Sequence, residues 1–600
     1  MTENNSEIKK EKKPTRAILL RLGKYVFKHK FLFIIAIIFT LLSNQLALMG
    51  PEYSGNALDA IAAQGGVNMP EVTANVIKMA VCYVVSAVLS YVLSVIMVRL
   101  SQRIVHTMRR ELFEKLGRLP VSFFDTHPTG DIISRISYDI DTVNSSLSHD
   151  LVQIMTSVYT VVGSLIFMWR ISKPMLIIFV ITVPVSILFT RFRSKRVRPL
   201  FSLRSHKLGE LNGYAEEMLS GSATIRAYGK EGVISERFNT KNSDTMTAYY
   251  NAEYYGATLG PTVNFINNLS ICFVTILGGI LYMLSGSGRV LAGSIFFITL
   301  GGVAKFVQYS RKFAGPINEF ANILHEFQSA ISAAERIFKI LDEDEETADD
   351  EDAVPMERAD GEVSFDNVRF GYTEEREILH GVSFDALKGK TVAIVGPTGA
   401  GKTTIINLLM RFYDISSGDI TLDGISIKKL RRKELRQAFT MVLQDTWLFE
   451  GTIYDNIAYG REDATLEEVK TVARAARIDT YINKLADGYN TVLTDGGVNI
   501  SKGQRQLITI ARAMLSDAPM LILDEATSNV DSRTEIKIQE AMRNLMKGKT
   551  CFVIAHRLST IKNADVIIVL QDGLISELGS HDELIAKGGF YATLYNSQFK

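Results

Sequence analysis

The sequence predicts a multi-pass α-helical membrane domain, with six transmembrane helices and long cytosolic extensions, fused to a cytosolic α/β domain of the P-loop type. Three observations carry this prediction. Apolar stretches of membrane-spanning length crowd the first half of the 600-residue chain. Short β-type runs alternate with helical segments in the second half, where a glycine-rich motif follows an apolar strand.

The composition narrows the class of protein further. Hydrophobic residues make up 47% of the chain and charged residues 22%, so the charge must be segregated from the apolar sequence. The 66 basic and 65 acidic residues give a net charge of +1, which excludes the strongly basic signature of a dedicated nucleic-acid binder. The three cysteines are far apart, which argues against a disulfide-built secreted protein and against a structural zinc site.

Six apolar stretches are expected to cross the membrane, because each is close to the ~20 residues that a helix needs to traverse ~30 Å of hydrocarbon. They lie at 31–49, 76–98, 150–169, 174–190, 258–284 and 290–312. The alternative is a set of buried helices in a large soluble domain. Six such runs between charged segments make spans the preferred interpretation.

Lysine and arginine indicate the orientation of these spans. The loop at 49–75 contains none, whereas 101–149 contains six and 191–257 contains eleven. Because an excess of positive charge marks cytoplasmic segments, both termini are expected inside the cell. Both basic segments continue in helix-type sequence with few breakers, so the helices are expected to project well beyond the bilayer.

Changes in composition predict the domain boundaries. Asp342–Asp352 is almost entirely acidic, which is typical of a solvated linker; a regulatory acidic segment is the alternative. We expect a cytosolic N-terminus at 1–30, the six-helix domain at 31–340, the acidic linker at 341–360 and the α/β domain at 361–600. Within the N-terminus, Thr15–Lys28 is expected to form an amphipathic elbow helix on the inner membrane surface.

A phosphate-binding loop opens the chemistry of the second half. Thr391–Val395 is an apolar strand, and the next residues fit GxxxxGK[ST] before an apolar helix, which is the context this motif requires. Glycines let backbone N–H groups wrap phosphates, Lys402 is expected to reach the β- and γ-phosphates, and Thr403 to ligate Mg²⁺. The expected nucleotide-binding residues of this segment are Gly396, Pro397, Thr398, Gly399, Ala400, Gly401, Lys402, Thr403 and Thr404.

A second apolar strand ends in two carboxylates. It runs over 520–524 and is followed by Glu525. At the carboxyl end of a strand beside the P-loop, Asp524 can hold Mg²⁺ through water, and Glu525 can polarise the water that attacks the γ-phosphate. The two motifs together predict ATP binding and hydrolysis.

The residues around these motifs resemble those of ATP-binding cassette (ABC) proteins. The segment 500–506 resembles the LSGGQ signature and 528–531 the D-loop. The segments 123–131 and 221–231 resemble the coupling segments of ABC exporters. Tyr372 resembles the aromatic residue that stacks on adenine, Gln444 the Q-loop glutamine, and His556 the switch histidine.

The resemblance implies a type IV exporter half-transporter, in which two cassettes enclose two ATP molecules head to tail. It implies ATP-driven export of an amphiphilic drug, lipid or peptide across the plasma membrane by alternating access, in a bacterium. ATP and Mg²⁺ are the implied cofactors, and a second half-transporter and the lipid bilayer the implied partners. The resemblance implies catalytic roles for Glu525, His556 and Gln444, Mg²⁺ contacts for Thr403, Gln444 and Asp524, and contacts to the partner's ATP for Ser501, Gly503 and Gln504.

The signature departs from the family pattern. Lys502 stands where the family has glycine, and a long cationic side chain there alters the approach to the partner's γ-phosphate. Because its own hydrolysis motifs are intact, the chain resembles the catalytically complete subunit of heterodimeric bacterial multidrug-type exporters. A homodimer that tolerates Lys502 is one alternative. An ATP-regulated channel or regulatory subunit is another, which the intact Glu525 and His556 disfavour.

Polar residues within the spans are candidates for the substrate pathway. Lys305 is the strongest of them, because an unpaired cation facing lipid is costly. It is placed toward the inner end of the sixth span. The other candidates are Asn44, Gln45, Asn264, Asn267, Asn268 and Gln308. Cavity lining and hydrogen bonding between helices explain each of them equally well.

Overall fold

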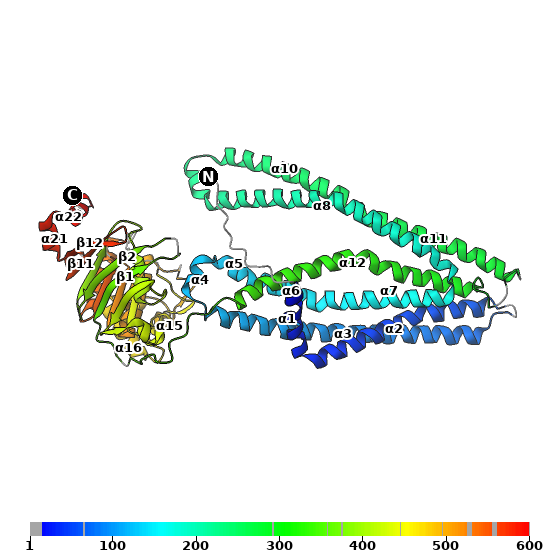
Figure 1. The fold of residues 1–600 in the computed structure, drawn as a ribbon, viewed down its shortest axis with the longest axis horizontal. Coiled ribbons are helices and arrows are strands. Elements are labelled where there is room, and N and C mark those ends of the chain that lie inside the picture. The colour runs from blue at the N-terminus through cyan, green and yellow to red at the C-terminus, as the bar shows by residue number, and fades with distance from the viewer. Residues whose placement is uncertain are drawn as a thin grey trace. The chain divides into compact units, whose positions relative to one another are not determined.

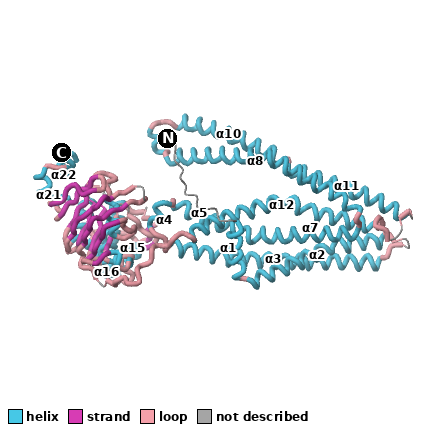
Figure 2. Tube along the Cα trace, viewed as in Figure 1, coloured by secondary structure: helices cyan, strands magenta, loops and turns pink. Residues whose placement is uncertain are grey.

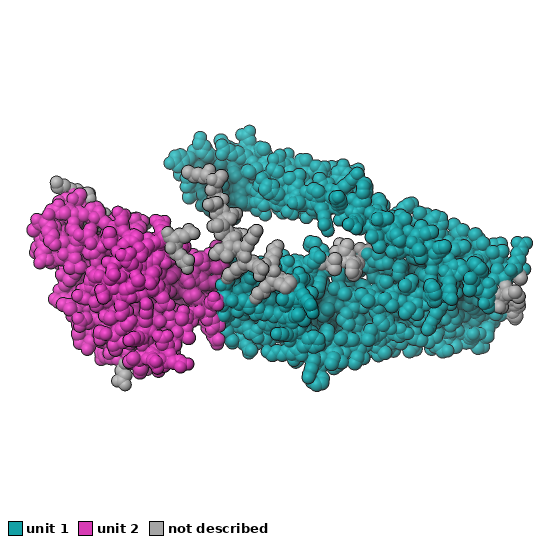
Figure 3. Space-filling view, in the orientation of Figure 1, with its two compact units in different colours: residues 1–117, 129–343 teal, residues 118–128, 344–600 magenta. Residues whose placement is uncertain are grey.

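The chain folds into two compact units in the computed structural model (Figure 3). The first spans residues 1–117 and 129–343, and the second spans 118–128 and 344–600. Every described strand belongs to the second unit (Figure 2). The structure describes residues 15–63, 66–287, 289–290, 293–356, 358–373, 376–443, 446–494, 496–497, 499–524, 531–554 and 561–598.

Long helices build the first unit (Figure 1). Two π-helical turns, Arg135–Asp139 and Ser146–Asp150, join α5, α6 and α7 into one continuous helical run. The helices are α1 (Thr15–Lys28), α2 (Lys30–Ile61), α3 (Met69–Leu116), α5 (Thr129–Ser134), α6 (Ile140–Ser145), α7 (Leu151–Ile171), α8 (Ile177–Ser220), α9 (Ser222–Ala227), α10 (Glu231–Ala257), α11 (Leu259–Gly286) and α12 (Leu300–Leu341).

Five helical runs among the described residues are long and apolar enough to cross a membrane. They contain the first five of the six expected spans. The runs are Lys30–Ile61, Met69–Leu116, Thr129–Ile171, Pro174–Ser220 and Glu231–Gly286.

The sixth expected span, 290–312, was placed too early. Helix α12 begins only at Leu300, where the Thr299 side chain accepts a hydrogen bond from the Gly302 backbone N–H and caps the helix. With Lys305 near its start, α12 is not among the five apolar runs. It nevertheless packs on α2, α7 and α11 in the same bundle, where its Phe306, Tyr309 and Phe313 are buried in an apolar core.

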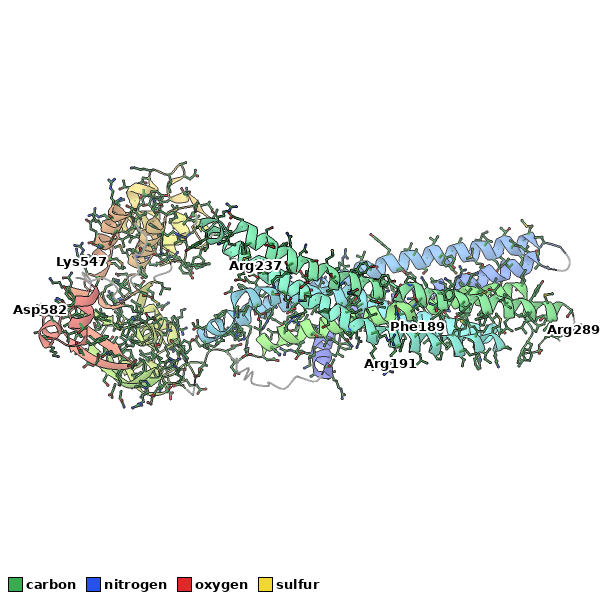
Figure 4. All side chains as sticks on the ribbon, turned by 90° about the horizontal axis from the view of Figure 1, so that it is seen from above. Phe189, Arg191, Arg237, Arg289, Lys547 and Asp582 are labelled. Carbon is green, nitrogen blue, oxygen red and sulfur yellow. The ribbon has the colours of Figure 1, made fainter. Side chains whose placement is uncertain are left out.

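The helical extensions predicted from the basic segments are confirmed. Helix α3 has 48 residues, a length of about 72 Å at 1.5 Å per residue, against ~30 Å of hydrocarbon. Helix α8 continues for 44 residues and turns back through the short α9 into α10. Arg191 is the first charged residue of α8, where its apolar part ends, and in Figure 4 Arg289 lies at the loop end of the bundle.

The amphipathic helix expected at Thr15–Lys28 is present as α1. Its buried side is fixed to the unit by Tyr25, whose hydroxyl donates to Glu111 Oε2 of α3 at 2.5 Å and whose ring stacks on Phe338 of α12. Leu20 and Phe27 are 62% and 65% exposed. Helix α1 is therefore anchored on one side and presents apolar side chains on the other.

Two sheets form the second unit. The larger has strand order β12-β11-β3-β10-β9-β6, all parallel except β12, and the smaller is antiparallel with order β2-β1-β4-β5. A two-stranded ladder pairs β7 with β8. The elements are α4 (Val121–Thr126), β1 (Val363–Phe370), β2 (Leu379–Ala386), β3 (Thr391–Val395), α13 (Lys402–Leu409), β4 (Ser417–Leu422), β5 (Ile425–Ser426), α14 (Arg432–Gln437), β6 (Phe439–Val442), β7 (Gly451–Thr452), α15 (Ile453–Ala458), α16 (Leu466–Ala475), α17 (Asp479–Ile482), β8 (Val492–Leu493), α18 (Lys502–Ser516), β9 (Met520–Asp524), α19 (Ser532–Met546), β10 (Thr550–Ile554), β11 (Val566–Gln571), β12 (Leu574–Gly579), α21 (His581–Lys587) and α22 (Phe590–Gln598).

The acidic segment between the units is not a solvated linker along its whole length. Glu346 accepts from Arg436 Nη2 at 2.5 Å, and Asp349 accepts from Arg432 Nη1 at 3.2 Å. Arg432 and Arg411 are only 6% and 7% exposed, so the acidic side chains and Asp414 together neutralise buried guanidinium groups. The charge run therefore has a structural partner.

Candidate functional site: a nucleotide cradle at one edge of the large sheet

Two glycines in the loop after β3 are required by close packing. A Cβ on Gly396 would lie 2.3 Å from the carbonyl oxygen of Leu570, and one on Gly401 would lie 2.7 Å from Leu379 Cδ2. Gly401 also has φ +101°, in the left-handed region that glycine favours. Pro397, Thr398 and Gly399 are exposed at the tip of the loop, and Ala400 is buried beneath it. The local sequence thus produces an exposed loop of backbone amides that leads directly into the first turn of α13.

Lys402 is the first residue of α13 and folds back over this loop. Its Nζ donates to the carbonyl oxygens of Gly396 at 2.8 Å and Pro397 at 2.9 Å. Burial lowers the pKa of Lys402, and the negative charge of Asp524 opposes that shift. The lysine expected to bind phosphate therefore lies inside the loop and within the field of the carboxylate of the second motif.

Tyr372, the expected adenine-stacking residue, is joined to α13. Its hydroxyl lies 3.2 Å from Thr404 Oγ1 and accepts from Asn407 Nδ2 at 3.2 Å. The rings of Phe370 and Tyr413 meet it nearly edge-on, with centroids 5.0 Å away in both cases. The tyrosine is 46% exposed, so part of the oriented ring remains accessible to a planar base.

The topology of the large sheet gathers the motifs at one edge. Strands β3, β10, β9 and β6 are adjacent and parallel, so their carboxyl ends meet where ligands bind in such sheets. Asp524 ends β9, next but one to β3. The expected catalytic residues Gln444, Glu525 and His556 follow β6, β9 and β10 within two residues in the sequence and lie outside the described residues.

Comparison with known proteins decides the family. The family model for the ABC transporter transmembrane region matches residues 33–302, and the one for ABC transporters matches residues 379–528. Over 98% of its length the chain is 40% identical to the uncharacterized ABC transporter ATP-binding protein YfiC of Bacillus subtilis (strain 168), of which the match covers 95%. The chain belongs to the ABC transporter family.

Two further similarities refine the architecture of this ABC transporter. It is 44% identical, over 82% of the chain and 76% of the relative, to the fatty acid ABC transporter ATP-binding/permease protein of Mycobacterium bovis. Its fold matches a solved structure of a bacterial Atm1-family ABC exporter with ATP bound, with a TM-score of 0.75, 29% identity and coverage of 95% and 98% of the two chains. The chain is therefore an exporter-type half-transporter, a multi-pass membrane protein that couples ATP hydrolysis to transport.

The signature residues of the transporter stand apart from the P-loop. Ser501 caps α18: its hydroxyl accepts from the Gln504 N–H at 3.3 Å, and Gln504 Oε1 accepts from the Ser501 N–H at 2.9 Å. Gly503 is buried in the first turn, and α18 packs on α15, α16, α19 and β6. The structure thus groups Tyr372, the P-loop and Asp524, while the signature forms a separate helix start.

The segment 123–131, expected to be a coupling segment, contains a contact that the sequence did not reveal. Helix α4 belongs to the second unit, and Tyr413 donates a hydrogen bond from its hydroxyl to Asp125 Oδ2 at the end of this helix. Burial, followed by the bond to Asp125, raises the pKa of Tyr413. The Phe123 ring stacks on His127 in the same segment. Tyr413 therefore contacts both Tyr372 and the segment that contains Asp125.

Lys305 of the transporter is paired, which favours hydrogen bonding between helices over cavity lining for this residue. Its Nζ donates to Glu52 Oε1 at 2.9 Å and to Asn56 Oδ1 at 2.6 Å, both on α2. Its expected placement toward the inner end was wrong, because Lys305 lies in the second turn of α12, next to the predicted outer loops. Close approach of Gly55 to Gly301 brings the two helices together there.

Three of the six other polar candidates in the spans bind neighbouring helices. Asn44 Nδ2 donates to Thr156 Oγ1 at 3.3 Å, and Gln45 Oε1 accepts from the Tyr159 hydroxyl at 2.7 Å. Gln308 Nε2 donates to Ser54 Oγ at 3.1 Å. Helix packing is therefore the better interpretation for these residues, whereas Asn267 lines a cavity.

Proposed function

We propose that this half-transporter exports a lipid-type amphiphile and that ATP drives the export. The ATP binds at the P-loop of this chain, and the signature of a second half-transporter completes the binding site. The observation that carries this proposal is the division of the site within one chain. The P-loop, Tyr372 and Asp524 form one group, and the signature caps a separate helix, α18. In this proposal residues 31–340 form the transport domain, 361–600 the ATPase domain, and both termini are cytoplasmic.

The side chains of the site have separate roles in this proposal. Lys402 exchanges its two carbonyl contacts for the β- and γ-phosphates, and Tyr372 orients the adenine. The phosphates also accept hydrogen bonds from the exposed amides of the loop. Glu525, Gln444 and His556, which lie outside the described residues, keep their expected catalytic roles, with Glu525 polarising the attacking water.

The donor set fits Mg²⁺. The Thr403 hydroxyl is exposed at the start of α13, and the carboxylate of Asp524 lies at the same edge of the sheet. Oxygen ligands of this kind suit Mg²⁺, which also neutralises charge on the phosphates when bound. Gln444 would supply the third protein contact.

The proposed assembly is a heterodimer in which this chain holds the hydrolysis-competent site. Lys502 sits in the first turn of α18, where the family signature has a glycine. The purified chain alone should hydrolyse little ATP, and co-expression with a second half-transporter should restore activity. Rapid hydrolysis by the homogeneous chain would support the homodimer instead. Two variants test the departures from the signature: Lys502→Gly restores the family's glycine, and Ile500→Leu restores its leucine. Ile500→Leu is the matched control and should change the ATPase rate less than Lys502→Gly.

The lipid cargo is proposed from the relative named as a fatty acid transporter. The test reconstitutes the assembled transporter in proteoliposomes and measures ATP-dependent movement of a fluorescent fatty acid between leaflets. Glu525→Gln should abolish this movement while ATP still binds. Movement that continues in Glu525→Gln would contradict ATP-driven export and favour the channel alternative.

A further inference from the structure

A small cavity lies among three helices of the membrane domain. Its volume is about 10 Å³, which admits one water-sized group. Polar residues from all three helices line it: Thr182 and Ser186 of α8, Asn267 and Ser270 of α11, and Ser310 of α12. A polar cavity at the depth of the predicted spans is costly unless something binds in it.

The amide of Asn267 is the unusual group in this cavity. Its Nδ2 is fully buried and has no hydrogen-bond partner among the described residues. The hydroxyls of Ser270 and Ser310 donate to carbonyl oxygens of their own helices, at 2.8 and 2.7 Å, so they cannot also donate into the cavity. A buried donor without an acceptor costs about 1–3 kcal/mol, so a ligand oxygen that accepts from Asn267 would remove that cost.

An apolar groove begins where the polar cavity ends. It has a volume of about 350 Å³ and is lined by α8 and α11. Thr182 lines both spaces, so the groove and the cavity are neighbours. The side chains along the groove are large and exposed: Ile181 at 60%, Phe273 at 48%, Ile276 at 55% and Ile280 at 50%.

The lining of the two spaces defines the chemistry of an occupant. No residue that lines either of them carries a charge. A phosphate-bearing head group would need arginine, lysine or a metal, so it does not fit. An extended apolar groove that leads to a single buried amide donor fits an acyl chain ending in a compact, oxygen-bearing group.

We propose that these two spaces form one binding site for a single-chain amphiphile, with the acyl chain in the groove and a carboxyl or ester oxygen accepting from Asn267. The site would hold the cargo of the proposed lipid export, so its functional role rests on that proposal. We assign the groove to a lipid of the bilayer because its exposed side chains lie on two predicted spans. A second copy of the chain covering the same face is the competing occupant.

The experiment uses the full chain in lipid nanodiscs and a diazirine-bearing palmitic acid as probe. Labelled peptides are mapped by mass spectrometry, with unlabelled palmitic acid as competitor. Asn267→Leu keeps the size of the side chain and removes the donor, whereas Asn268→Leu is the matched control, because Asn268 is exposed and lines neither space. Thermal melts establish that each variant is folded.

Saturable labelling of α8 and α11, about tenfold weaker in Asn267→Leu and unchanged in Asn268→Leu, is the expected result for one lost hydrogen bond of about 1.4 kcal/mol. Ile276→Trp, which fills the groove, should also remove the label. Labelling that is non-saturable, or equal in the two asparagine variants, would show annular lipid and overturn the site. So would a cross-link from a Phe273→Cys variant to a second copy with no lipid label.

The outcome separates this site from the proposed export. Labelling that depends on Asn267, without ATP-dependent movement of fatty acid in proteoliposomes, would leave the site standing and refute lipid export. Movement of fatty acid with labelling confined to other helices would support export and refute the site.

Discussion

Arg432 offers a direct test of whether the acidic segment is held by the ATP-binding unit. The side chain is 6% exposed and makes three different contacts. Its Nη1 donates to the Thr347 carbonyl at 2.5 Å and to Asp349 Oδ1 at 3.2 Å, and its Nη2 donates to Asp414 Oδ2 at 3.3 Å. Arg432→Ala removes all of these contacts and leaves Asp349, Asp414 and Glu346, whose Oε1 lies 3.8 Å from Arg432 Nε, without this cation.

The magnitude follows from the burial of each partner. Breaking a fully buried ion pair costs about 3–5 kcal/mol. The carboxylates of Asp349 and Asp414 keep 30% and 47% of their exposure, so solvent screens the pair and the expected loss falls to about 2–3 kcal/mol. At about 2–4 °C per kcal/mol for a unit of this size, the unfolding temperature of the ATP-binding unit should fall by about 4–12 °C.

The assay is thermal unfolding of the full chain in detergent. The adjacent Arg431 is the matched control, because its side chain is 54% exposed and its contact to Glu434 is 3.6 Å long. Arg431→Ala should cost at most about 1 kcal/mol, as exposed ion pairs do. A shift of less than about 2 °C for Arg432→Ala, or equal shifts for the two variants, would refute the argument that the acidic segment is clamped.

Three further outcomes are expected. Tyr413→Phe should keep ATP affinity, since the ring packing on Tyr372 remains, but lower the lipid-stimulated ATPase several-fold, because Asp125 loses its donor; equal stimulation in variant and parent would contradict this. Glu52→Gln should destabilise the membrane unit by about 2–3 kcal/mol because it leaves the ammonium of Lys305, 11% exposed, without an anion, and adding Lys305→Met should recover most of that loss in a thermal melt. Burial raises the pKa of the Cys551 thiol to about 12, so its thiolate fraction at pH 8 is on the order of 10⁻⁴ and maleimide should modify it only after denaturation, as mass spectrometry would show.

The parts of the protein that local sequence encodes were predictable. The P-loop was found because strand, glycines and helix are contiguous, and the close approach of Leu570 explains why Gly396 must be glycine. The long helices were found because apolar and basic segments alternate along the chain. The expected start of the sixth span was wrong because hydropathy does not reveal a capping residue such as Thr299.

The features that sequence reasoning missed depend on partners far along the chain. Lys305 was left open between cavity lining and helix packing, because its carboxylate partner lies 253 positions away on another helix. Glu346 was assigned to a solvated segment, and its arginine partner Arg436 lies 90 positions away. A charge pattern gives the sign of the local field but not the tertiary contact that neutralises it.

The segment that follows the P-loop helix, residues 411–414, joins the nucleotide site to both stretches of chain through which the second unit continues into the membrane domain. Tyr413 contacts Tyr372 on one side and Asp125 of the coupling segment on the other. Arg411 pairs with Asp349 of the acidic segment, and Asp414 pairs with Arg432, which itself binds Asp349. Since Glu346 N–H also donates to the carbonyl of Arg118 at 3.0 Å, the two stretches are bonded to each other. A displacement of α13 would therefore move both stretches together, because closely packed side chains have few intermediate arrangements that could absorb the movement.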